Sequence, residues 1–366
     1  MRTLLGTLVS LLLALRLSAQ VPAALSDSAF GALSVSLSEP SGFFDTDNLV
    51  SNEDSYLHAV TTLQKLGIQG GAYLGVGPDQ NFSYIAAIHP RIAIIVDIRR
   101  DNLLELLLFK SIFALSRNRA DYLSLLFGKT VPADTAGWGA KSPEELFAAL
   151  SGAGIDSARA VARIRNRATR LGIPLSNKDL ATITRFHRTF ITRGPSLKLL
   201  SFDRPERTDY PDFRSLVLAT DLAGRQANYL ASEAAFQVVK SLQDRNLIVP
   251  VVGNFSGAHA LQAIAQYLKG RGETVKVFYT SNVEEYLVRD ESIGRFARNV
   301  AQLPRDHDAV IVRSYFPYGR PHPLHVQGFL SVQMVQRVDH FLQLVSDTTD
   351  YINYRDLVSR YLVDPR

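Results

Sequence analysis

Hydrophobic positions along the chain follow two different spacings, and the switches between them predict where strands give way to helices. The clearest strand is 92–97, where a continuous run of apolar, mostly β-branched residues leads into Asp97. Such a run is typical of a strand covered on both faces. A shorter apolar run at 72–77 closes on glycines, as expected of a buried strand that enters a tight turn. Helical spacing at 81–88 separates the two strands, and a strand, helix, strand unit of this length predicts a parallel pair.

Helical spacing dominates the middle of the chain. The leucine-rich segment 102–127 predicts one or two amphipathic helices, and from 128 to 213 the strand signals vanish. Ahead of the first strand, Ser51 and Asp54 are spaced like the cap and the capping partner of a helix that ends near Gly67. Strands are predicted again further on, at 247–252, 275–279 and 309–313. The sequence therefore predicts an α/β fold that is Rossmann-like, with a mostly parallel sheet, helices on both faces and a helical insertion.

This pattern divides the chain into a signal peptide at 1–19, a first part of the Rossmann-like domain at 20–127, a helical insertion at 128–213 and a second part of the domain at 214–366. Arg2, the apolar run behind it and the small residues before Gln20 are typical of a secretory signal peptide. The apolar run is about a dozen residues long, shorter than the roughly 20 that a membrane-spanning helix needs. We expect an exported protein, periplasmic or extracellular, with no stable membrane anchor after leader removal. A retained anchor or a buried helix is the alternative.

The composition excludes some kinds of chemistry but does not identify the function. An apolar share of 46% with 20% charged residues is the balance of a folded globular chain. Cysteine is absent, which excludes thiol nucleophiles, thiolate metal sites and disulfides. Removal of the leader takes away Arg2 and Arg16 and lowers the formal net charge from +5 to +3, which is only weakly basic. The arginines within 159–170 could meet phosphates, but a solvated helix face is the simpler interpretation, so no nucleic-acid partner is expected.

Glycines and an acid at the ends of the first two strands predict a ligand pocket. In an open parallel sheet, ligands bind beyond the carboxyl ends of the strands. Gly75 and Gly77 end the first strand and let the backbone approach a ligand closely, and Asp97 ends the second strand about 20 residues later. At that spacing an acidic side chain accepts hydrogen bonds from ribose hydroxyls. The alternative is a glycine turn for helix packing, with Asp97 paired to Arg99 or Arg100.

The run 73–79, Tyr-Leu-Gly-Val-Gly-Pro-Asp, together with Asp97 resembles the S-adenosylmethionine-dependent methyltransferases of the Rossmann-like class. The likeness implies a small nucleoside-type ligand, S-adenosylmethionine or a relative, and places Asn254 near the transferred methyl group. The cofactor-binding residues that it implies are Gly75, Gly77, Asp79, Asn81, Asp97 and Asn254. Two departures are Tyr73, where the class has an acidic residue, and Asp79, in the place of a third glycine. Asp79 and Asn81 have an alternative role as helix caps.

A bacterial family of uncharacterised proteins has similar runs at 43–48, 77–82, 96–100 and 281–284. This likeness spans nearly the whole chain behind the leader and names no reaction. Around the last run, Tyr279, Asn282 and Glu284 are predicted at the sheet edge that carries the pocket, which makes them substrate-binding candidates. Ser281 and Glu284 are also spaced like a capping box at the start of a helix.

The remaining candidate residues give weaker signals. Oxygen ligands for a hard cation gather at Asp45, Asp47, Asn48, Asn52 and Glu53. Their spacing lacks the glycine and the distal glutamate of a helix-loop-helix calcium site, so no metal is predicted. No Gly-x-Ser-x-Gly elbow occurs, and a hydrolase rests only on isolated serines such as Ser83 and Ser256.

Three functions remain open at this stage. A methyltransferase-like enzyme would bind a nucleoside-containing donor and would need no triad, because methyl transfer depends chiefly on in-line positioning; no catalytic residue is assigned. The alternative is an exported, non-catalytic binding or scaffold protein with a degenerate cofactor pocket, which the departures at Tyr73 and Asp79 favour. The third is an exported hydrolase that uses the same crevice, since one fold hosts unrelated activities.

Overall fold

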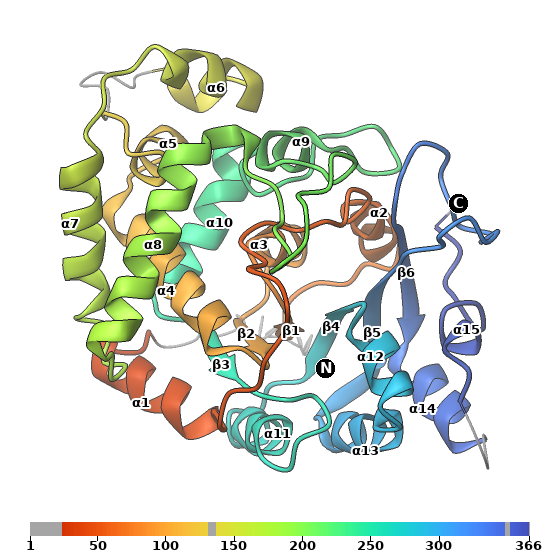
Figure 1. Cartoon of the computed structure of the whole chain (residues 1–366). Coiled ribbons are helices and arrows are strands. Elements are labelled where there is room, and N and C mark those ends of the chain that lie inside the picture. The colour runs from red at the N-terminus through yellow and green to blue at the C-terminus, as the bar shows by residue number, and fades with distance from the viewer. Residues whose placement is uncertain (1–23, 131–136, 348–351, 366) are drawn as a thin grey trace, which may run out of the picture.

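A computed structural model describes residues 24–130, 137–347 and 352–365. Its centre is a six-stranded sheet in the order β3-β2-β1-β4-β5-β6 (Figure 1). Neighbouring strands from β3 to β5 are parallel, and β6 runs antiparallel to β5 at the edge. The strand bounds are β1 Ala72–Gly75, β2 Ile92–Asp97, β3 Ile248–Val252, β4 Val275–Ser281, β5 Arg305–Tyr315 and β6 Val332–Arg337. The predicted α/β class and mostly parallel sheet are confirmed.

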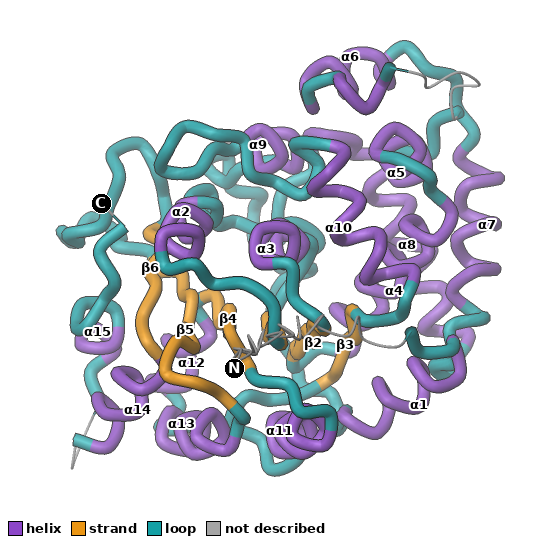
Figure 2. The backbone as a smooth tube through the Cα atoms, turned by 180° about the vertical axis from the view of Figure 1, so that it is seen from behind, coloured by secondary structure: helices purple, strands orange, loops and turns teal. Residues whose placement is uncertain are grey.

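Helices cover both faces of the sheet (Figures 1 and 2). One face carries α2, α3, α4 and α10, and the other carries α1, α11, α13 and α14, while α7 and α8 pack on α4 in a further layer. The α-helix bounds are α1 Asp27–Leu37, α2 His58–Lys65, α3 Gln80–Ile88, α4 Arg100–Leu115, α5 Arg119–Leu126, α6 Pro143–Ser151, α7 Ser157–Ala168, α8 Asn177–Arg193, α9 Phe213–Leu218, α10 Glu233–Asp244, α11 Ala260–Gly270, α12 Val283–Arg289, α13 Ile293–Gln302, α14 Val338–Ser346 and α15 Tyr354–Leu357. Short 3-10 turns lie at Trp138–Ala140 and Gly194–Ser196.

The strand, helix, strand unit at the start of the sheet follows the sequence pattern closely. Every residue of β1 and β2 is buried, as a parallel strand under helices on both faces requires. The two strands pair in parallel from Ala72 opposite Ile92 to Gly75 opposite Ile95. Strand β1 is shorter than the predicted 72–77, because the chain turns into α3 after Gly75. The unit thus delivers the carboxyl ends of β1 and β2 side by side.

One strand was not predicted and one predicted helix starts later than expected, and both cases concern polar residues with distant partners. Strand β6 was missed because Gln333 and Gln336 interrupt its apolar pattern, yet both are buried. Gln336 Oε1 accepts from the Arg313 guanidinium, so a polar side chain is satisfied inside the sheet layer. The helix expected from Ser51 begins only at His58. Asp54 is not its capping partner, because its carboxylate accepts from the Leu330 amide at 2.7 Å.

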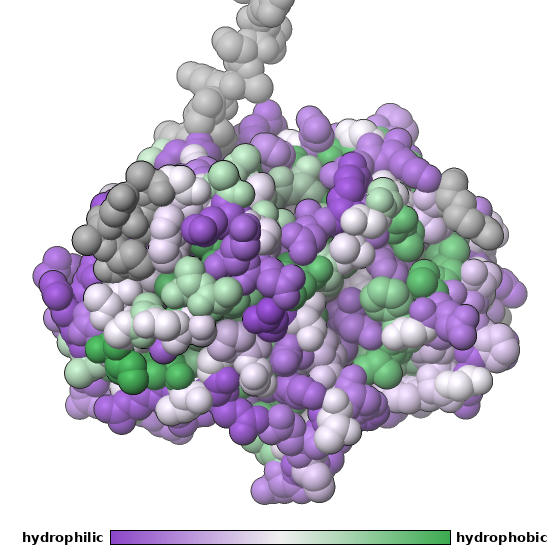
Figure 3. All heavy atoms as spheres, turned by 90° about the horizontal axis from the view of Figure 1, so that it is seen from above, coloured by the Kyte–Doolittle hydropathy of each residue, from purple (hydrophilic) through white to green (hydrophobic). Residues whose placement is uncertain are grey.

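The outer surface mixes side-chain types. On the face seen from above, hydrophobic residues form small separate groups among hydrophilic ones (Figure 3). Within the described ranges, no helix combines the length and apolar character that a bilayer crossing requires. The predicted signal peptide at 1–19 lies outside the described residues, so export stays a prediction.

Candidate functional site

A cavity of about 1170 Å³ lies at the carboxyl ends of the parallel strands. The turns after β1, β2, β3 and β4 line it, and the segments 43–53 and 199–210 form further walls. Strands β2 and β3 lie on one side of β1, and β4 and β5 lie on the other, so the strand order reverses beside β1. Ligands of open α/β sheets bind at such a reversal. The volume lies just above the roughly 300–1,000 Å³ of ordinary ligand pockets.

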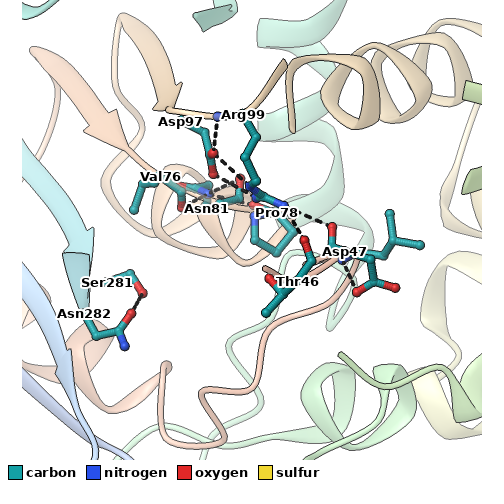
Figure 4. Close-up of polar contacts among 11 residues, drawn as sticks. Thr46, Asp47, Val76, Pro78, Asn81, Asp97, Arg99, Ser281 and Asn282 are labelled. Carbon is teal, nitrogen blue, oxygen red and sulfur yellow. Dashed lines mark hydrogen bonds and ion pairs between the residues drawn. The ribbon is translucent and has the colours of Figure 1, made fainter. Parts of the chain in front are cut away.

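The turn after β1 is held by a buried asparagine. Asn81 Nδ2 donates to the carbonyls of Val76 at 2.9 Å and Pro78 at 2.7 Å (Figure 4). Its Oδ1 accepts from the Tyr73 hydroxyl at 2.8 Å. A Cβ on Gly75 would lie 2.0 Å from Asn81 Oδ1, so no side chain fits there. Gly77, at φ +81°, lines the cavity. Of the predicted loop residues, Gly77 therefore faces the cavity, while Gly75 and Asn81 build the turn.

Asp79 turns away from the cavity into the helical layer. Its Oδ2 accepts from the Tyr229 hydroxyl at 3.0 Å, and the Tyr229 and Tyr122 hydroxyls are 3.2 Å apart. Burial raises the pKa of the Asp79 carboxyl to about 6, although the Tyr229 hydrogen bond opposes that rise. Asp79 stands at the start of α3 without a side-chain capping bond. The helix-cap alternative is wrong for this residue.

Asp97 lines the cavity, but its carboxylate is shared with Arg99. Arg99 donates from Nε to Oδ1 at 3.1 Å and from Nη2 to Oδ2 at 2.9 Å, and its amide donates to Oδ1 at 2.9 Å. The same guanidinium donates from Nη1 to the carbonyls of Thr46 and Asp47, at 3.3 and 3.1 Å (Figure 4). This is the pairing that the sequence left open, and Arg100 instead pairs with Asp179. Oδ2 keeps capacity for one further hydrogen bond.

The other candidates divide between the cavity and the interior. Asn254 and Asn282 line the cavity, but Asn254 follows β3, which β2 separates from β1. Tyr279 is fully buried, and its hydroxyl donates to Glu53 at 2.6 Å. Glu284 is also fully buried and forms an ion pair with Arg313 at 2.6 Å. Asn282 is therefore the cavity-facing member of the group predicted around β4.

The capping box predicted for Ser281 and Glu284 was wrong. Ser281 is the last residue of β4, with φ +53°, and its hydroxyl donates to Glu53. The N-cap residue of α12 is Asn282, and no side chain accepts a capping hydrogen bond there. Glu284 is drawn into its pair with Arg313, whose guanidinium is also fully buried. Burying a charge without a partner costs several kcal/mol, so this ion pair outweighs a local cap.

Glu53 is the cavity residue whose role the sequence did not reveal. Its side chain is 2% exposed and accepts from the Tyr279 hydroxyl, the Ser281 hydroxyl and Gln333 Nε2. No ion pair to Glu53 occurs in the parts of the chain that the structure describes. Burial raises the pKa of its carboxyl, and the hydrogen bonds only partly oppose this. Its partners Tyr279 and Gln333 lie 226 and 280 residues away, so no local pattern could identify the cluster.

The acidic segment at the cavity wall is engaged in other contacts. Asp45 pairs with Arg204, and Asp47 Oδ1 accepts from the Leu200 amide at 3.1 Å. Among the described residues, no three His, Asp or Glu side chains gather in a way that could hold a metal ion. Most arginines that line the cavity are paired in the same way, as in Arg207 with Asp209.

One family matches the chain, over residues 48–137 and 201–362. It is described as "Domain of unknown function (DUF7790)". The chain belongs to this family. The matched ranges contain all six strands of the sheet and most of the cavity, and they leave out 138–200, where α6, α7 and α8 lie. No curated protein matches the chain.

Proposed function

We propose that this DUF7790 protein has a Rossmann-like, methyltransferase-like fold and binds a nucleoside-containing small molecule, S-adenosylmethionine or a relative, in the cavity. The observation that carries the proposal is that Gly77 and Asp97 line the same cavity from neighbouring parallel strands, where the strand order reverses. That position is the usual ligand site of open α/β sheets. The volume of about 1170 Å³ leaves space for a second reactant beside such a ligand.

In this proposal the cavity residues have distinct roles. The open backbone at Gly77 lets the ligand approach the turn, and the remaining acceptor capacity of Asp97 Oδ2 takes one ribose hydroxyl. Arg99 holds the carboxylate in place, so the site is preorganised and carries little net charge. Asn282 offers an amide from the β4 side.

A second candidate is a non-catalytic exported binding or scaffold protein with a degenerate pocket. The Asp97–Arg99 pair favours it, because three of the hydrogen bonds that a ribose-binding carboxylate could accept are already made. Asp79 and Asn81 also face the interior instead of the cavity. In that case adenosyl compounds should not bind.

Thermal unfolding with adenosyl ligands separates the two candidates. S-adenosylmethionine, S-adenosylhomocysteine and adenosine would each be added at millimolar concentration to the mature protein. A ligand present at 100 times its dissociation constant stabilises the folded state by about 2.7 kcal/mol. We expect an upward shift of the melting temperature with at least one of the three. The absence of any shift would reject the nucleoside site and favour the scaffold candidate.

Matched variants assign the shift to the cavity. Asn282→Ala and Asp97→Asn should reduce it, because both residues line the proposed site. Asn166→Ala is the control, since Asn166 is exposed on α7. If Asp97→Asn binds as well as the unmodified protein, the carboxylate has been misassigned.

We also propose that the chain is exported after removal of residues 1–19. The proposal rests on the leader-like pattern of Arg2, the apolar run behind it and the small residues before Gln20. Intact mass spectrometry of the protein from its native cells should find an amino terminus near Gln20. An uncleaved leader in the soluble cell extract would contradict export.

A further inference from the structure

Ser281 has an unusual backbone conformation at the edge of the cavity. It ends β4 at φ +53°, a left-handed conformation that few non-glycine residues adopt. The chain then enters α12 after a single residue, Asn282. Such strained residues cluster at functional sites, where a side chain must be held in one direction. Ser281 lines the cavity, so this sharp turn presents a hydroxyl-bearing residue to a ligand.

The hydroxyl of Ser281 donates to the Glu53 carboxylate. Glu53 Oε2 accepts from the Tyr279 hydroxyl at 2.6 Å and from Gln333 Nε2 at 3.1 Å, which directs Oε1 toward Ser281. Nearly complete burial without a cationic partner raises the pKa of this carboxyl, and a base with a raised pKa accepts a proton more readily. A hydroxyl, a base in hydrogen-bond contact with it and a third group that orients the base are the parts of an activated nucleophile.

Aromatic rings offer an apolar surface in a cavity that Arg289, Asp290 and Arg295 also line. The Phe44 and Tyr286 rings line the same cavity and pack edge to face, with their ring centroids 5.2 Å apart. Glu53 carries negative charge when ionised, which disfavours an anion beside it. A neutral ester with a small acyl group combines an electrophilic carbon for Ser281 with an apolar part for these rings.

We propose that Ser281 Oγ is a nucleophile for neutral carboxylic esters and that Glu53 is its general base. In the first step the Oγ–carbon bond forms, the Oγ proton passes to Glu53, the bond to the alkoxide leaving group breaks, and that leaving group takes the proton from Glu53. In the second step water attacks the acyl carbon and gives a proton to Glu53. The bond to Oγ then breaks and Ser281 recovers its proton. This activity lies beyond the proposed nucleoside binding, because it uses the β4 end of the cavity and does not depend on Asp97.

Covalent labelling with a fluorophosphonate probe tests the nucleophile directly. The mature protein would be incubated with the probe, and the modified residue located by peptide mass spectrometry. We expect one label, on Ser281, and slow release of nitrophenol from p-nitrophenyl acetate. No label, or a label on another residue, would overturn the proposal.

Three variants separate chemistry from folding. Ser281→Gly should lose the label while keeping the melting temperature, because glycine adopts φ +53° without strain. Glu53→Gln should slow labelling by about 100-fold or more, the usual contribution of a general base. Ser256→Ala is the matched control, since Ser256 also lines the cavity but its hydroxyl contacts Asn254 and no carboxylate.

The pH profile and the adenosyl experiment complete the test. In the unmodified protein, labelling should increase with pH as Glu53 loses its proton, and this dependence should vanish in Glu53→Gln. Labelling of Glu53→Gln at the unmodified rate would overturn the role of Glu53. Ser281→Gly should retain any melting shift caused by adenosyl ligands, so failure at the β4 end and failure at the β2 end of the cavity are distinguishable.

Discussion

Two carboxylates of the cavity are both buried, but their negative charge is balanced in different ways. Asp97 ends β2, and Glu53 lies beside Ser281 at the end of β4, so the two places are called the β2 end and the β4 end. At the β2 end, Asp97 has a bidentate ion pair with Arg99, whose remaining donor holds the backbone of 46–47. At the β4 end, the donors to Glu53 among the described residues are all neutral: the Tyr279 and Ser281 hydroxyls and the Gln333 amide. The Arg99 countercharge holds Asp97 in place at the β2 end. At the β4 end, Glu53 has no such countercharge and can exchange a proton with a ligand. This difference suggests two roles: the β2 end positions a ligand, and the β4 end has a carboxyl suited to proton transfer.

The largest effect is expected when the β2 end loses its cation. Arg99→Met leaves Asp97 buried without a countercharge and leaves the carbonyls of Thr46 and Asp47 without their donor. Breaking a buried ion pair in this way destabilises a protein by about 3–5 kcal/mol. The free energy of unfolding in urea at pH 7 measures the change.

Arg360→Met is the control for this prediction. Arg360 pairs with Asp356 at the surface, at 3.3 Å with both side chains exposed. Removing an exposed pair of this kind changes stability by about 0.5 kcal/mol or less. Equal losses of stability for the two variants would mean that the Asp97–Arg99 ion pair contributes no more than an exposed one.

A smaller effect is expected in the turn between β1 and α3, where two glycines differ in purpose. A Cβ on Gly75 would lie 2.0 Å from Asn81 Oδ1 and 2.8 Å from the Tyr73 hydroxyl, and both neighbours are buried. Overpacking of this kind costs about 1–3 kcal/mol, and Gly75→Ala should lie near the upper end. A Cβ on Gly77 would lie 3.5 Å from its nearest neighbour, so Gly77→Ala should cost only the strain of an alanine at φ +81°, about 1–2 kcal/mol. The melting temperatures of the two variants measure the difference. A larger loss of stability for Gly77→Ala than for Gly75→Ala would mean that Gly77, and not Gly75, is the residue packed inside the turn.

These assignments also mark how far the sequence could predict the molecule. Strand β2 was predicted with its observed bounds, because a continuous β-branched run between helical segments is a local signal. The meeting of the β1 and β2 ends followed from the parallel unit. The choice between a free Asp97 and one paired with Arg99 did not follow, because both arrangements fit the same spacing.

Glu53 and strand β6 were beyond sequence reasoning for a common physical reason. Buried polar groups are stabilised by partners, and here those partners come from distant parts of the chain. Gln333 looks like an interruption of an apolar strand until its contacts with Glu53 and the Ser314 hydroxyl are known. Ser281 and Glu284 are spaced like a capping box, but Glu53 and Arg313 engage them instead. Local patterns predict elements, whereas these clusters depend on how the elements meet.

The smallest effect is expected at the β4 end, and there the pH dependence is the informative quantity. Glu53→Gln keeps the shape of the side chain and removes the ionisation, so at pH 4 it should change stability by about 1 kcal/mol or less, the net value of one altered hydrogen bond. Burial raises the pKa of Glu53 in the folded state above its unfolded value of about 4.3. The folded protein therefore binds this proton more tightly than the unfolded chain does. The stability linked to Glu53 is complete below the unfolded pKa and is lost as the pH rises through the folded pKa.

Glu53→Gln should consequently gain stability relative to the unmodified protein between pH 4 and pH 8, as measured by urea unfolding at several pH values. Glu144→Gln, in an exposed pair with Arg214, is a control for removing a surface carboxylate. If the gap between Glu53→Gln and the unmodified protein instead moves in the opposite direction with rising pH, the carboxylate form must be stabilised in the folded state. The β4 end would then be a charge-balanced wall like the β2 end, and the contrast between the two ends of the cavity would disappear.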